Sequence, residues 1–173
     1  MSTITTRPMT LFRVDFADLY LRHMCRHSQF GINVVHLLSL FGVWFGVYGI
    51  VYALIHVEWV PIALAVGYLA LVALNAPLRV CIATAVFLAL FLAALFWLPE
   101  LPIWVYALMI PVFYKVQSWS HKIYTAATDM TEFNKRYPKG AVLFGVLLIN
   151  EVPIVLNYLC FDKKRWLTQA SLL

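Results

Sequence analysis

The chain has 173 residues, of which 63% are hydrophobic and only 12% charged, and its mean hydropathy is +0.82. Soluble domains carry about 25% charged residues, so this composition excludes a water-soluble enzyme, and the 16% aromatic content excludes a disordered chain. The net charge of +5 comes from basic residues between apolar stretches, which indicates membrane topology and no nucleic-acid partner. We therefore expect residues 1–173 to form one all-α integral membrane domain.

The charged start of the chain predicts an amphipathic helix over residues 9–30, lying along the membrane interface. At 100° per residue, one arc of about 100° holds six apolar or aromatic side chains, whereas the charged side chains lie on another face. The six are Phe12, Phe16, Leu19, Tyr20, His23 and His27. The two histidines thus continue an apolar stripe.

Four apolar runs follow, and each predicts a transmembrane helix. They cover residues 32–56, 59–76, 79–98 and 102–120. A helix needs roughly 17–25 apolar residues to cross a hydrocarbon core about 30 Å thick, and these runs satisfy that requirement. Residues 121–140 are then expected to form a cytoplasmic loop.

The last apolar segment, residues 141–161, contains Asn150, Glu151 and Pro153. Cytoplasmic loops carry an excess of Lys and Arg, and all 13 basic residues share one side only if this segment dips into the membrane and returns. We therefore predict a broken or re-entrant fifth segment, with both termini in the cytoplasm. The compact chain favours a bacterial inner membrane over the endoplasmic reticulum. A carboxylate at membrane depth is costly unless paired, so Glu151 is expected to pair with Lys115.

Four of the five histidines are predicted to share the cytoplasmic layer. His36 begins the first span and His121 ends the fourth, while His23 and His27 precede the first span. His56 lies at the opposite face, about 30 Å from His36 at 1.5 Å per residue. Two imidazoles at i,i+4 can ligate one metal ion, and a set of imidazoles suits iron, zinc, copper or nickel. A merely structural role for these histidines is the alternative.

Two motifs carry a family resemblance. The first is Leu19-Tyr20 followed by His23, His27 and then His36, which lies at the start of a span. The second is Gln117-Ser-Trp-Ser-His121, at the end of a later span. Together they resemble the signatures of the yeast-type 2-hydroxy fatty acid dioxygenases. The chain departs from that family's pattern where the family has Asn four residues before its second His. That place falls on Ile32, with Asn33 displaced by one.

The resemblance implies a membrane-embedded, Fe(II)-dependent dioxygenase of fatty acid alpha-oxidation, which cleaves the C1–C2 bond of a 2-hydroxy fatty acid with O2. It implies His23, His27, His36 and His121 as metal ligands, with Glu132 or Asp129 as a further candidate. Lys122 is our candidate for binding the substrate carboxylate, as are Arg22 and Arg26. Gln117, one turn before His121, is a candidate hydrogen-bond partner of the site.

Three other functions are weighed against this one. A di-iron hydroxylase or desaturase typically uses more histidines than can gather here. A haem or quinone electron carrier would place histidines on facing spans within the membrane, and a non-catalytic scaffold or lipid-binding protein would need no metal. A homo-oligomer is left open.

Overall fold

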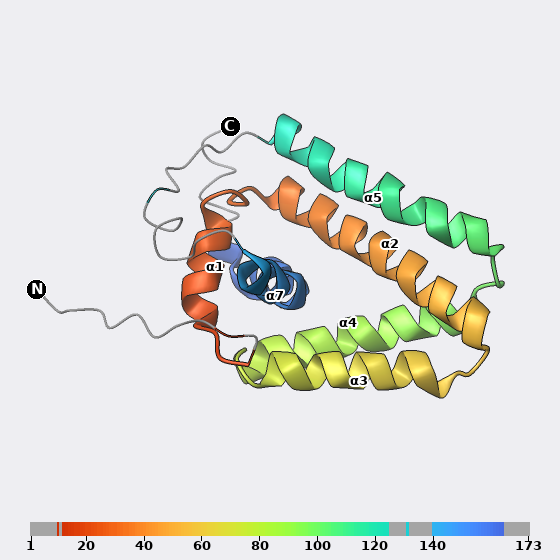
Figure 1. The fold of residues 1–173 in the computed structure, drawn as a ribbon. Coiled ribbons are helices and arrows are strands. Elements are labelled where there is room, and N and C mark those ends of the chain that lie inside the picture. Colours follow the sequence, from red (N-terminus) through yellow and green to blue (C-terminus); the bar gives the residue numbers. More distant parts are fainter. Residues whose placement is uncertain (1–9, 11, 125–130, 132–139, 165–173) are drawn as a thin grey trace, which may run out of the picture.

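The computed structural model describes residues 10, 12–124, 131 and 140–164. Every secondary-structure element in these ranges is a helix, which confirms the predicted all-α class (Figure 1). The helices are α1 (Phe16–Met24), α2 (Phe30–Ile55), α3 (Trp59–Ala73), α4 (Leu78–Trp97), α5 (Ile103–Ile123) and α7 (Ala141–Phe161). Within the described ranges, α2, α4 and α7 are long and apolar enough to cross a membrane, and α3 is a shorter apolar helix.

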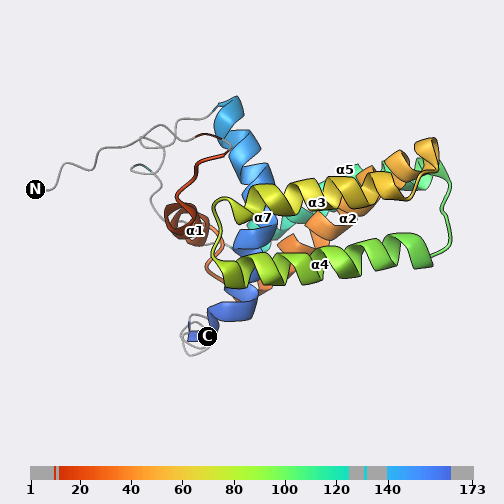
Figure 2. The ribbon, with the colours of Figure 1, turned by 90° about the horizontal axis from the view of Figure 1, so that it is seen from below.

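The four helices α2 to α5 alternate in direction and form two pairs. α2 packs along α5, and α3 packs along α4. The pairs meet at the end where α2 leads into α3 and diverge toward the other end, where α1 and α7 lie between them (Figure 1). The turned view shows that α7 runs across the direction of the other four helices (Figure 2). The start of α2 and the end of α5 lie at this same end.

Glycines allow α2 to approach α5 closely. Gly42, Gly46 and Gly49 recur at spacings of four and three, so they lie on one helical face. A Cβ atom on Gly46 would lie 2.6 Å from the carbonyl oxygen of Tyr106, and one on Gly42 would overlap the ring of Phe113. Small residues of this kind let two membrane helices pack backbone to backbone. The packing fixes where the end of α5 lies beside the start of α2.

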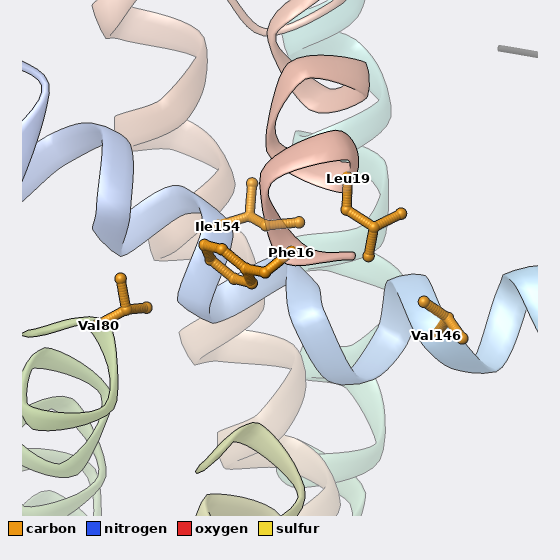
Figure 3. Close-up of a cluster of buried hydrophobic side chains, with 5 residues drawn as sticks. All are labelled: Phe16, Leu19, Val80, Val146 and Ile154. Carbon is orange, nitrogen blue, oxygen red and sulfur yellow. The ribbon is translucent and has the colours of Figure 1, made fainter. Parts of the chain in front are cut away.

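The first helix is shorter than the predicted residues 9–30. α1 begins at Phe16 because the side chain of Asp15 accepts a hydrogen bond from the backbone N–H of Asp18 at 3.0 Å, which is an N-terminal cap. Phe12 precedes the helix and is 66% exposed, so it does not belong to the buried stripe. Phe16 and Leu19 do, and Figure 3 shows them packed against Val80 of α4 and against Val146 and Ile154 of α7.

The prediction of a broken segment over residues 141–161 is wrong, because α7 is one continuous helix with Pro153 inside it. Proline has no backbone N–H, so the carbonyl oxygen of Ile149, four residues earlier, loses its helical partner. The hydroxyl of Tyr68 on α3 donates a hydrogen bond to that oxygen at 2.7 Å. A neighbouring helix thus supplies the hydrogen bond that proline removes.

We expect Tyr68→Phe to destabilise the fold by about 1–3 kcal/mol, the cost of leaving a buried carbonyl without a donor. Thermal unfolding in detergent measures this loss, with Tyr114→Phe as the control at a 64% exposed tyrosine. In a Pro153→Ala background the alanine N–H can donate to the carbonyl oxygen of Ile149, so Tyr68→Phe should lower the stability less there. An equal cost in both backgrounds would contradict this account of the proline.

Candidate metal centre

The structure brings four histidines together at the end of the bundle where α1 and α7 lie. The ring of His23, in the last turn of α1, stacks on that of His27 with a centroid distance of 4.0 Å. His36 on α2 and His121 on α5 lie edge-on to His27, at centroid distances of 4.4 and 4.9 Å. His36 and His121 are themselves 5.0 Å apart by ring centroid. Three separate segments therefore converge on one point.

His27, His36 and His121 each present a nitrogen to the same small space. Their ligand atoms all lie within 4.8 Å of one another, and the Nε2 atoms of His27 and His36 are 3.0 Å apart. Two nitrogens bound to one ion at about 2.0–2.1 Å lie no more than about 4 Å apart. The buried pair satisfies this limit, and the exposed His121 presents its ligand atom within 4.8 Å of both.

Hydrogen bonds determine which nitrogen of His27 is free. Its Nδ1 lies 3.2 Å from the carbonyl oxygen of His23, and because a carbonyl can only accept, Nδ1 carries the proton. The lone pair of a neutral His27 is therefore on Nε2, directed at His36. The Nδ1 of His36 is buried without a hydrogen-bond partner. This arrangement suits a metal ion, since ligating imidazoles must offer an unprotonated nitrogen.

Asn33 is a site residue that the sequence analysis did not nominate. It is fully buried, and its amide nitrogen donates to the carbonyl oxygens of His27 and Gln29 at 2.6 and 2.8 Å. Its Oδ1 lies 3.0 Å from Nε2 of His23, which must therefore be the donor. Asn33 thus fixes the loop that carries His27. It also accepts a hydrogen bond from His23, which is not one of the three histidines that could hold a metal ion. The sequence feature that could have identified Asn33 as a site residue is an amide side chain three residues before His36, in an otherwise apolar run.

Burial keeps the two histidines that precede α2 neutral. It lowers the pKa of His23 to about 4, although the hydrogen bond with Asn33 acts in the opposite direction. It also lowers the pKa of His27 far below its usual range, and the neighbouring imidazoles add to the effect. Both rings are therefore uncharged near neutral pH, as metal binding requires.

The other predicted site residues are placed differently. His56 lies at the opposite end of α2, where it is exposed 4.0 Å from Glu100, so it is no part of the cluster. Lys122 is exposed at the end of α5. Asp129 and Glu132 lie outside the described residues.

Two arginines that precede α2 lie near the histidines. Arg26 is near enough to interact electrostatically with His121, and Arg22 with His23. The Nε atom of Arg22 is buried without a hydrogen-bond partner. These two cations border the cluster on the side of α1.

The prediction that Glu151 pairs with Lys115 is wrong. Oε1 of Glu151 accepts a hydrogen bond from the side-chain amide of Gln117 at 3.0 Å, whereas Lys115 is exposed. Lys115 and Gln117 are two residues apart on α5 and so do not share a helical face. Gln117 therefore joins α5 to α7 one turn before His121, instead of bonding to an imidazole.

An apolar pocket of about 290 Å³ lies between α2, α3 and α7. Its walls include Val43 and Val47 of α2 and Tyr68 of α3. Val43 and Val47 follow His36 by seven and eleven residues, which places all three on one stripe of α2. The pocket thus begins about 10 Å along α2 from His36 at 1.5 Å per residue.

Comparisons with protein-family models, curated proteins and solved structures return no match for this chain.

Proposed function

We propose that the protein is a membrane-embedded, non-haem iron oxygenase that acts on a lipid. The observation that carries the proposal is the convergence of His27, His36 and His121 within 4.8 Å of one another, in a chain whose helices suit a membrane. Three imidazoles leave coordination positions free for substrate and O2, and iron is one of the metals that imidazole suits. The resemblance in the two histidine motifs favours iron over zinc, copper or nickel.

The proposed reaction is oxidative cleavage of the C1–C2 bond of a 2-hydroxy fatty acid. One 2-hydroxy acid and one O2 give the acid shortened by one carbon, CO2 and water. The C1 and C2 carbons of the substrate together lose four electrons and O2 accepts four, so no separate reductant is needed. Bound Fe(II) would supply the activation of O2, which amino-acid side chains cannot provide by themselves.

The protein's own residues would bind and orient the substrate. Arg22 and Arg26 border the histidines and suit the carboxylate, because a guanidinium offers several N–H donors in a planar arrangement. Lys122, next to His121 in sequence, is the other candidate. The apolar pocket beside Val43 and Val47 would take part of the acyl chain, since lipid sites are lined mainly by apolar side chains.

The test is metal analysis and turnover on protein purified without oxygen. We expect about one iron per chain, O2 consumption with a 2-hydroxy fatty acid, and release of the acid one carbon shorter. A Soret band would indicate a haem protein instead. Absence of bound metal would favour a scaffold or lipid-binding protein and would overturn the proposal.

We further propose that α7 lies along the cytoplasmic face of the membrane and does not cross it. α7 runs across α2 and α4 (Figure 2), so it cannot be parallel to the membrane normal together with them. Contacts inside the protein account for its apolar character, because 56% of its most apolar 18-residue stretch is buried, compared with 28% for α4. Both termini then lie on the cytoplasmic side.

The expected topology is checked by labelling and a reporter. A cysteine at Glu58→Cys, in a background without the native cysteines, should react with an impermeant reagent added outside. A reporter fused to the carboxyl terminus should register a cytoplasmic location. An external reporter would mean that α7 crosses the membrane.

A further inference from the structure

The apolar pocket beside α2 has an inner wall made of packed aromatic rings. The ring of Trp44 lies at right angles to that of Tyr68 on α3, with a centroid distance of 4.7 Å. Tyr48 is the wall residue farthest from His36 along α2, and its ring packs on Phe91 of α4 at 5.0 Å. Close-packed side chains have little freedom to move apart, so this wall fixes the extent of the pocket.

The outer side of this pocket is open. Val47 of α2 is 43% exposed and Leu148 of α7 is 52% exposed, and both line the cavity of about 290 Å³. In helices that suit a membrane, exposed apolar side chains of this kind contact hydrocarbon. A lipid tail can therefore enter the pocket sideways from the bilayer, without crossing water.

Contacts on two sides place the pocket beside the metal centre. On α2 it begins about two helical turns after His36. On the other side, Leu148 lies one turn before Glu151 on α7, and the Glu151 carboxylate accepts the hydrogen bond of Gln117 at 3.0 Å. Gln117 in turn lies one turn before His121 on α5, so the two share a helical face. Both walls of the pocket thus lead to a metal ligand.

The distance along α2 gives the length of tail that fits. Val43 and Tyr48, the first and last wall residues on α2, lie about 10 and about 18 Å from His36 at 1.5 Å per residue. An extended backbone spans about 3.6 Å over the three bonds of a residue, or about 1.2 Å per bond, and an extended acyl chain advances at a similar rate. A tail whose carboxylate end is at the metal therefore reaches the pocket after about nine carbons and its far end after about fifteen.

From these observations we propose that the pocket selects the substrate by the length of its acyl chain. 2-Hydroxy acids of about sixteen carbons fill it, whereas those of about eight do not reach it. Val47 and Leu148 contact the tail, and these contacts end at Tyr48, so still longer tails gain nothing more from the protein. The inference rests on the proposed function and names the substrate class of that site as long-chain 2-hydroxy acids.

The test compares kcat/KM for these two acids in the full chain, purified in detergent and loaded with Fe(II). Val47→Trp and Leu148→Trp fill the pocket from opposite walls. Each should lower kcat/KM for the long acid by about tenfold or more, since one methylene in an apolar pocket is worth at least about that factor, and should leave the short acid unchanged. Val66→Trp is the matched control, because Val66 of α3 is 62% exposed and is no part of the pocket wall. Partition of an acid into detergent is the same for every variant, so ratios between variants remove it.

A second measurement needs no turnover. A long 2-hydroxy acid with a photoreactive diazirine about twelve carbons from its carboxylate should label residues 43–48 or Leu148, and Val47→Trp should remove that label. If the wild-type protein oxidises no 2-hydroxy acid, the proposed oxygenase is wrong, and the labelling still decides whether the pocket holds a tail. Label outside the pocket, or equal losses of kcat/KM for the long and short acids in Val47→Trp, would overturn the inference. Iron content should match the wild type in all three variants.

Discussion

His36→Ala and His121→Ala are each expected to abolish iron binding and lipid oxidation. Losing a residue that only orients a ligand typically costs about 10–100-fold in metal affinity or activity, and losing a ligand should cost more. His121 is exposed, so its replacement leaves no cavity in the core and tests the metal site separately from folding. Elemental analysis after anaerobic purification, together with O2 consumption, measures both effects.

The matched control is His56, on the same helix as His36. His56 ends α2 with a φ of 52°, a left-handed conformation that Asn tolerates better than Ala. His56→Asn is therefore the appropriate variant, and it should keep wild-type iron content and turnover. His23→Ala should have an intermediate effect, because His23 is bonded to Asn33. Full metal content in the His36 and His121 variants would refute the site.

Gly46→Ala is expected to destabilise the protein and also to lower its iron content. The new Cβ atom would lie 2.6 Å from the carbonyl oxygen of Tyr106, and because a backbone atom cannot rotate away, α2 and α5 must separate. Overpacking of this kind typically costs about 1–3 kcal/mol. The shift moves His121 relative to His36, since each lies on one of the two helices. Thermal unfolding and metal analysis on the same sample test both consequences.

Gly67→Ala provides the comparison for this effect. A Cβ atom on Gly67 of α3 would meet no atom within 4 Å, so only helix propensity changes, and Ala is favoured over Gly by about 1 kcal/mol. We therefore expect Gly67→Ala to be neutral or slightly stabilising, with iron content unchanged. Similar losses of stability in both variants would show that the glycines of α2 do not determine the packing of α5.

The sequence by itself determined the all-helical class of the protein, the approximate positions of α2 to α5 and the separation of His56 from the other histidines. Hydrophobicity and charge decide these features locally, because an apolar run must leave water wherever it lies in the chain. The 1.5 Å rise of a helix likewise places His36 and His56 at opposite ends of α2 without any tertiary contact.

Only the tertiary structure decided the partner of Glu151, the continuity of α7 and the role of Asn33. Each depends on a group supplied by a segment distant in sequence or by the fold of a loop. Gln117 reaches Glu151 from another helix, Tyr68 replaces the hydrogen bond that Pro153 removes, and Asn33 binds the backbone at His27. A sequence shows that a buried polar group needs a partner, but the packing of the helices determines which residue provides it.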